Sequence, residues 1–165
     1  GDCDFTLADL ARLCDVFYIG GTKVGALFGE AVVFKSEEMH RSFRYAIKQH
    51  GGMLAKGRLL GIQFEQLLKG GDDCLYFRLA RHANEQASRI RKAFEAKGIP
   101  MWMNSTTNMQ FPILAEEQQA ILGEKYVPEF WGKYDGERDV VRFCTSWATR
   151  PENVDGLREY IERML

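Results

Sequence analysis

A lysine in a glycine-rich segment is the residue of this sequence best suited to covalent chemistry. Lys23 lies in segment 20–25, Gly-Gly-Thr-Lys-Val-Gly, directly after the apolar run 17–19. Gly20, Gly21 and Gly25 permit backbone angles and close approaches that side chains forbid, so the amine can be aimed into a cavity and kept partly dry. An amine in such surroundings gives up its proton more readily and attacks a carbonyl carbon. A single Gly-Gly-x-Lys is more often an exposed polar turn, so the segment alone leaves both interpretations open.

A second candidate is an arginine in a late apolar run. Arg142 lies between Val141 and Phe143 in a segment that reads as a strand. A guanidinium there needs an anion or a position at the rim, because burying it unpaired is costly. From the residues alone, an outward-facing strand arginine is the simpler interpretation and a ligand contact is the alternative.

Charge and cysteine spacing exclude several classes of function. The 22 basic and 23 acidic residues give a net charge of −1, whereas a nucleic-acid or anionic-membrane surface needs a surplus of cations. Cys3, Cys14, Cys74 and Cys144 lack the spacing of a zinc site or a disulfide framework. We therefore expect no metal site, and free thiols that are mostly packed as small apolar groups.

No stretch of the sequence reads as a membrane span or a leader. A span needs about 18 consecutive apolar residues, and a signal peptide needs a charged segment followed by an apolar one. Neither pattern occurs, so a cytoplasmic location is the expectation.

Three stretches together carry a resemblance to a known family. They are Asp15–Glu30, Lys48–Gly57 and Val141–Thr145, in this order. The chain resembles, over nearly its whole length, the fold type I lyases that depend on pyridoxal 5'-phosphate (PLP), in the threonine aldolase and β-eliminating lyase family. The resemblance implies an α/β parent enzyme in which Lys23 carries the cofactor as a Schiff base.

The same resemblance implies roles for other residues. Arg142 matches the arginine that grips the substrate α-carboxylate through two parallel hydrogen bonds. Lys56 matches a basic residue that meets the cofactor phosphate, in several members across a subunit boundary, and Arg58 is the alternative for this role. Three neighbours of the lysine are expected to add backbone or hydroxyl contacts to the cofactor: Gly20, Gly21 and Thr22.

The resemblance also sets expectations for the parent protein. With 165 residues and Gly1 at its start, the chain reads as the C-terminal part of a longer enzyme. Residues that pair with the cofactor ring would lie upstream, so the fragment alone should be inactive. The expected reaction is cleavage of a β-hydroxy amino acid such as threonine to glycine and an aldehyde, by a homodimer or homotetramer.

Two departures from the family keep alternatives open. Val24 follows the lysine where a polar residue is expected, and Thr22 precedes it where better-known threonine aldolases have serine. A PLP-dependent β-eliminating lyase or aminotransferase therefore remains an alternative. So does a folding or dimerisation module without chemistry of its own.

The pattern of the first half predicts the end of a large domain, residues 1–35, followed by a helix that links it to a small domain, residues 36–165. A short helix is expected at 6–13, a core strand buried on both faces at 16–19, and a returning strand at 26–34. Ser36 followed by two glutamates predicts a helix start, with an apolar face that continues to Ile47.

The second half reads as an α+β domain. Apolar spacing predicts an amphipathic stretch at 54–68 and a long helix from the Asp72–Asp73 pair to Gly98. An edge strand is expected at 109–114 because of Pro112, and strands at 130–134 and 138–144 around an Asp-Gly turn predict a hairpin. The last helix is expected to begin with a capping box at Thr149.

Overall fold

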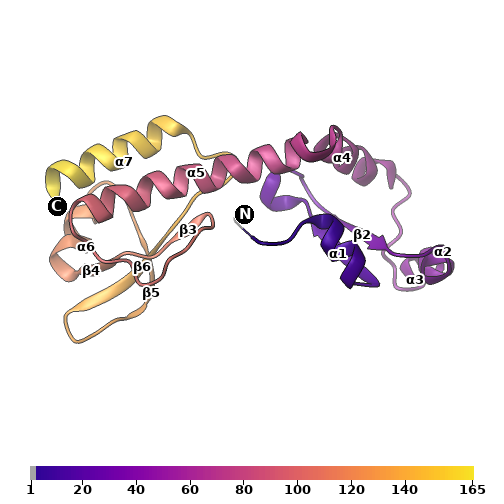
Figure 1. The fold of residues 1–165 in the computed structure, drawn as a ribbon, viewed down its shortest axis with the longest axis horizontal. Helices are drawn as coiled ribbons and strands as arrows, with labels where there is room; N and C mark the ends of the chain where they lie inside the picture. Colours follow the sequence, from indigo (N-terminus) through magenta and orange to yellow (C-terminus); the bar gives the residue numbers. More distant parts are fainter. Residues whose placement is uncertain (1–2) are drawn as a thin grey trace. The chain divides into compact units, whose positions relative to one another are not determined.

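The structure, a computed structural model, describes residues 3–165 in two compact units. The N-terminal unit is Cys3–Arg78 and the C-terminal unit is Leu79–Leu165 (Figure 1). The predicted division after residue 35 concerns a large domain of the parent enzyme, so it stays a prediction.

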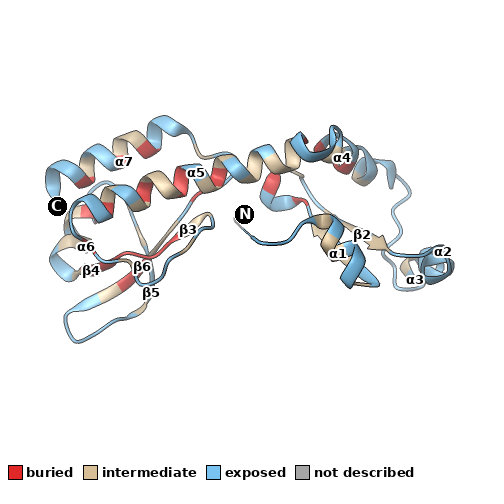
Figure 2. Cartoon of the chain, in the orientation of Figure 1, coloured by how far each residue is buried: buried red, intermediate tan, exposed pale blue. Residues whose placement is uncertain are grey.

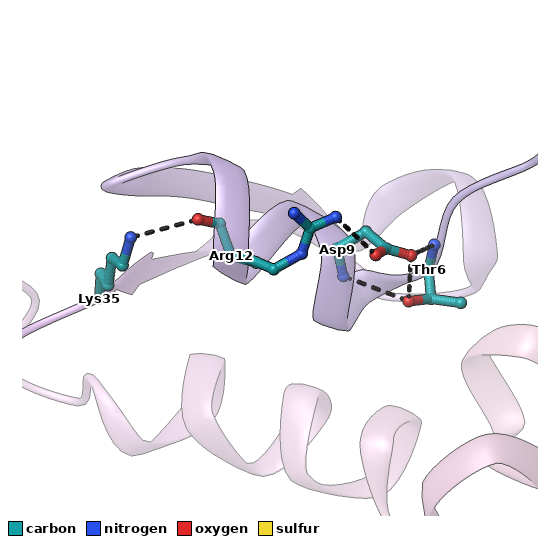
Figure 3. Close-up of polar contacts among 4 residues, drawn as sticks. All are labelled: Thr6, Asp9, Arg12 and Lys35. Carbon is teal, nitrogen blue, oxygen red and sulfur yellow. Dashed lines mark hydrogen bonds and ion pairs between the residues drawn. The ribbon is translucent and has the colours of Figure 1, made fainter.

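The N-terminal unit begins with the predicted short helix. Helix α1 spans Leu7–Leu13, and Thr6 forms a capping box with Asp9: the Thr6 hydroxyl accepts from the Asp9 amide at 3.2 Å while the Asp9 carboxylate accepts from the Thr6 amide at 2.9 Å. Arg12 donates to Asp9 at 3.2 Å, and Lys35 donates to the Arg12 carbonyl at 3.2 Å (Figure 3). The end of the helix is thereby tied to the segment that follows the second strand.

Two antiparallel strands follow this helix. Strand β1 (Val16–Gly20) pairs with β2 (Glu30–Phe34), and the short helix η1 (Thr22–Val24) begins the connection between them. The expectation of a strand buried on both faces is wrong for this chain, since Tyr18 is 70% exposed. Within residues 3–165 the two strands pair only with each other, so alternate side chains face outward.

Helices make up the rest of the N-terminal unit. The expected helix after Ser36 is divided into α2 (Glu37–His40) and α3 (Phe43–Gln49), and Ser36 makes no capping hydrogen bond. Phe43, the first residue of α3, packs its ring edge-on against that of Phe34, with the ring centres 4.8 Å apart. Helix α4 (Arg58–Leu68) and the turn η2 (Gly71–Asp73) complete the unit.

The long helix α5 spans Leu75–Ala96, as its apolar spacing predicts. Its buried apolar positions recur every three or four residues, and they are Ala83, Ala87, Ile90 and Phe94. Gly98 ends it with φ +70°, a left-handed angle that glycine adopts without a steric penalty.

The C-terminal unit contains an antiparallel sheet with β6 (Arg138–Cys144) at its centre. Strand β5 (Glu129–Lys133) pairs along one edge of β6, while β3 (Met109–Gln110) and β4 (Ile113–Ala115) pair along the other. The predicted hairpin is confirmed. The single strand expected at 109–114 is wrong, because Pro112 and its neighbour interrupt it.

Helices cover one face of this sheet. Helix α6 (Glu116–Gly123) and helix α7 (Pro151–Met164) pack with α5 on β4 and β6, and Figure 2 shows the buried stripe along α5. The core of this face consists of Ile90, Phe94, Ile99, Leu114, Leu122, Val141, Val154, Leu157 and Ile161. The opposite face holds a smaller buried cluster of Phe111, Ile113 and Val140.

Two further expectations need correction. Arg150, not Thr149, is the residue before α7, because the Thr149 hydroxyl accepts from the Ser146 amide at 2.8 Å instead. Of the cysteines, Cys74 is buried whereas Cys3 and Cys144 are exposed, so the thiols are not mostly packed. Across residues 3–165, no helix combines the length and apolarity that crossing a bilayer requires.

Candidate functional site

Lys23 lies in η1, the turn that follows β1, as the sequence predicts. Its side chain is exposed, so this part of the chain does not provide the partly dry surroundings that we expected. Among residues 3–165, its Nζ has no hydrogen-bond or ion-pair partner. The amine is therefore available to react, and Thr22 beside it is exposed as well.

The three glycines around the lysine differ in what they do. Gly25 has φ +98°, a left-handed angle that favours glycine. At Gly21 a Cβ atom would lie 2.8 Å from the Cβ of Ala26 and 2.9 Å from Cζ of Phe64, so the turn depends on the absence of a side chain. At Gly20 no atom lies within 4 Å of such a Cβ and φ is not positive. The expectation that the backbone requires glycine is thus confirmed at Gly21 and Gly25, and it is wrong for Gly20.

Helix α4 and the start of α5 hold this turn in place. Gln63 of α4 accepts a hydrogen bond from the Leu27 amide at 2.7 Å and donates to its own helix at the Leu59 carbonyl at 2.9 Å. Tyr76 of α5 donates to the carbonyl of Gly20 at 3.1 Å, and burial raises the pKa of this phenol. The lysine turn is therefore fixed by contacts from residues 36 and 56 positions later in the chain.

The two candidate phosphate residues lie just before and at the start of α4. Lys56 and Arg58 are both exposed, and the Lys56 carbonyl accepts from the Leu59 amide at 3.0 Å. A nearby hollow of about 400 Å³ is lined by Arg44, Lys48, Gly51, Met53, Leu54 and Ala55. The structure does not distinguish Lys56 from Arg58 as the phosphate contact.

Arg142 lies on the face of β6 that the helices leave uncovered. Its Nε donates to Oε2 of Glu129 at 3.0 Å and its Nη2 donates to the same oxygen. The guanidinium carbon lies 5.0 Å from the centre of the Trp131 ring, and Nη1 lies 3.9 Å from Sδ of Met109. The Glu129 carboxylate raises the pKa of Arg142. The anion that the sequence required is therefore supplied within the same hairpin.

Sequence reasoning missed Glu129 and Trp131. Glu129 is paired with Arg142 across the two strands, and the register shifts between Phe130 and Gly132, which leaves Trp131 as the extra residue of a β-bulge. The Trp131 ring lies 5.2 Å from Phe111 and is 46% exposed. No residue type marks the bulge, so nothing in the sequence indicated these two contacts of Arg142.

The predicted site residues fall into the two units. Lys23, its neighbours and Lys56 belong to the N-terminal unit, whereas Arg142 belongs to the C-terminal unit. Their roles toward cofactor and substrate stay predictions. In the part of the chain that the structure describes, no three histidine, cysteine or carboxylate side chains are grouped to hold a metal ion.

Comparison with known proteins gives relatives by sequence and by structure. No family model matches the chain. The low specificity L-threonine aldolase of Pseudomonas aeruginosa is 30% identical over 154 residues, and that of a Pseudomonas species is 29% identical; in both, 92% of this chain and 42% of the relative are covered. A structure of threonine aldolase from Leishmania major matches with a TM-score of 0.87 and 40% identity over 98% of this chain and 46% of that one.

More distant structures share the fold. Serine palmitoyltransferase from Sphingomonas wittichii matches with a TM-score of 0.60 at 14% identity, covering 94% of this chain and 40% of that one. A structure described as SPT with a PLP internal aldimine matches with a TM-score of 0.59 at 12% identity and the same coverage. The fold is accordingly that of the fold type I enzymes.

Within this class the sequence and the structure point to one family. The chain is a homologue of the threonine aldolases, as its three characteristic stretches predict. It spans less than half the length of the relatives it matches.

Proposed function

We propose that this chain is part of a PLP-dependent aldolase that cleaves a β-hydroxy amino acid, such as threonine, to glycine and an aldehyde. The observation that carries the proposal is the match to threonine aldolases over 92% to 98% of the chain. Since the relatives are more than twice as long, the activity belongs to the complete protein and not to residues 1–165 alone.

The residues in the lysine turn fit the cofactor. The Lys23 amine has no competing partner in residues 3–165, and η1 presents it directly after a strand. When bound, PLP supplies an electron sink for the bond that breaks at the substrate α-carbon. Lys23 is the amine that holds the cofactor aldehyde, Lys56 or Arg58 supplies positive charge for its phosphate, and the backbone and hydroxyl of the 20–22 segment flank it.

Arg142 is the residue that fits the substrate. A guanidinium has five N–H groups, and the two that Glu129 engages leave others for the α-carboxylate. A carboxylate held by two parallel hydrogen bonds has a fixed orientation, which sets the direction of the bond to the β-carbon. A homodimer or homotetramer is part of the proposal, and light scattering of the complete protein checks it.

Borohydride trapping of the complete protein tests the cofactor assignment. Reduction should attach PLP irreversibly to the tryptic peptide that contains Lys23, and a Lys23→Ala variant should take up no label there. Lys69→Ala serves as the matched control, because it also removes one exposed lysine of the same unit and has no proposed role toward the cofactor. Labelling that persists in Lys23→Ala at another lysine would contradict the assignment.

The reaction is tested by mixing the complete protein with threonine. Release of acetaldehyde together with glycine supports the aldolase. Release of ammonia with a keto acid would indicate β-elimination, and transfer of the amino group to a keto acid would indicate an aminotransferase.

A further inference from the structure

The guanidinium of Arg142 is held on two sides by residues of the neighbouring strand. Glu129 accepts from Nε and Nη2, which form the side-on edge of the guanidinium, and the guanidinium carbon lies 5.0 Å from the centre of the Trp131 ring. Both contacts come from β5, whose bulge at Trp131 sets the register that pairs Glu129 with Arg142. The orientation of this long side chain is thereby restrained by a strand that is itself hydrogen-bonded to β6.

Glu129 and Trp131 leave the end of the guanidinium, formed by Nη1 and Nη2, available for another acceptor. Five N–H groups are present, and Glu129 engages one on Nε and one on Nη2. Nη1 has as its contact Sδ of Met109 at 3.9 Å, and thioether sulfur is a weak acceptor. The Arg142 side chain is 24% exposed, so it is partly open to solvent. Nη1 and the second N–H of Nη2 can therefore donate two parallel hydrogen bonds to a carboxylate that approaches end-on.

We infer that Glu129 and Trp131 are positioning residues, which hold Arg142 side-on so that its end-on edge receives the α-carboxylate of the amino acid. The inference rests on the proposed function, since it assigns the partner of the same arginine. The negative charge of Glu129 is not what binding needs. Binding needs a hydrogen-bond acceptor at position 129, because the acceptor fixes the orientation of the Arg142 guanidinium.

A second arginine on β6 provides a matched control. Arg138 donates from Nε and Nη2 to Oδ2 of Asp135 at 2.9 and 2.7 Å, and its guanidinium carbon lies 5.0 Å from the ring of Tyr134. An arginine, a carboxylate that accepts from it and an aromatic ring thus occur together at the turn of the hairpin as well. Asp135 also accepts from the amides of Glu137 and Arg138, so its loss perturbs the hairpin more than the loss of Glu129 does.

The experiment compares binding of glycine with binding of glycinamide to the complete, PLP-loaded protein by calorimetry. The two ligands differ in the carboxylate, so the ratio of their dissociation constants isolates the contact to Arg142. Glu129→Ala should lower the preference for glycine about tenfold, the factor expected for one charge-assisted hydrogen bond. Glu129→Gln keeps an acceptor and should retain the preference. Asp135→Ala should leave it unchanged.

Three results would overturn the inference. If Glu129→Ala and Glu129→Gln both bind glycine more tightly than the original protein, Glu129 competes with the substrate and does not position the arginine. If Asp135→Ala lowers the preference as much as Glu129→Ala, the effect belongs to the hairpin as a whole. If neither variant at Glu129 changes the ratio, the residue has no role in binding.

The proposed function can fail independently of this result. A protein that releases no acetaldehyde from threonine but shows the expected pattern of ratios refutes the aldolase and supports the positioning role. A protein that cleaves threonine while Glu129→Ala keeps the full preference for glycine refutes the positioning role and supports the aldolase.

Discussion

The packing around Gly21 leads to a prediction that tests whether a glycine is needed there because a side chain would not fit. Gly21 has φ −106° and ψ −28°, angles that alanine adopts without strain, so Gly21→Ala tests space alone. The new Cβ would lie 2.8 Å from Cβ of Ala26 and 2.9 Å from Cζ of Phe64. Since carbon atoms pack at about 3.5 to 4.0 Å, these neighbours must move by about 0.7 Å or more.

The magnitude follows from two opposing effects. Overpacking of this kind costs about 1–3 kcal/mol. Alanine restricts the unfolded chain more than glycine does, which restores about 0.4–1 kcal/mol. Phe64 is 8% exposed and cannot swing into solvent, so we expect a net local destabilisation of about 1–2 kcal/mol. Gly20→Ala is the matched control, because open space surrounds that position, and it should change stability by less than about 0.5 kcal/mol.

Hydrogen–deuterium exchange of the complete protein measures this difference locally. A loss of about 1–2 kcal/mol makes the amides of β1 and β2 exchange roughly 5 to 30 times faster in Gly21→Ala, and Gly20→Ala should match the original protein. Borohydride labelling of Lys23 should fall in Gly21→Ala as well, since the turn that carries the amine moves. Equal exchange in the two variants would refute the steric reasoning.

Three further predictions concern the C-terminal unit. Phe94 is fully buried, so Phe94→Ala should lower the free energy of unfolding by about 3–5 kcal/mol in urea titrations, whereas Phe130→Ala at a position 58% exposed should cost far less; equal losses would contradict the assigned core. The Lys133 ammonium lowers the pKa of Asp139 through a hydrogen bond. The ionised carboxylate therefore stabilises the fold at pH values above its unfolded pKa of about 3.9, and this stabilisation is lost as the pH falls through the lower pKa of the folded state. Asp139→Asn should therefore be less stable than the original protein at pH 7, with the difference shrinking toward pH 3 in urea titrations, and a difference that does not vary with pH would rule this out. Arg142→Lys keeps the charge but loses the planar fork, so the KM for threonine should rise at least about tenfold while borohydride labelling of Lys23 is unchanged; an unchanged KM would remove Arg142 from the substrate site.

Features that depend on nearby residues could be predicted from the sequence. The helix at α1 follows from a cap and its partner three positions later, and the hairpin follows from an Asp-Gly turn between two apolar runs. The long helix α5 follows from the spacing of its apolar residues. Each of these signals is contained in a short window, so tertiary context did not overrule it.

Features that depend on register or on distant packing could not be predicted. Counting back from the Asp-Gly turn without a bulge pairs Glu129 with Phe143, on the face that packs against the helices. The bulge at Trp131 shifts the register by one residue and pairs Glu129 with Arg142 instead. No residue type marks that shift, so the partner of the arginine was invisible in the sequence. The close approach of Phe64 to Gly21 was equally invisible, because the two lie far apart in the chain.

The internal partner of Arg142 is compatible with the substrate-binding role that we propose for this arginine. An unpaired guanidinium between apolar neighbours would lose hydration without compensation, so its side chain would turn toward solvent. Glu129 replaces the lost hydration at one edge, and the Trp131 ring centre lies 5.0 Å from the guanidinium carbon. A carboxylate that arrives at the other edge then adds hydrogen bonds without displacing Glu129, and it meets a side chain whose rotamer is already restricted. In the proposed role, the strength of carboxylate binding depends on how firmly β5 holds the arginine, so changes at the Trp131 bulge should alter substrate binding.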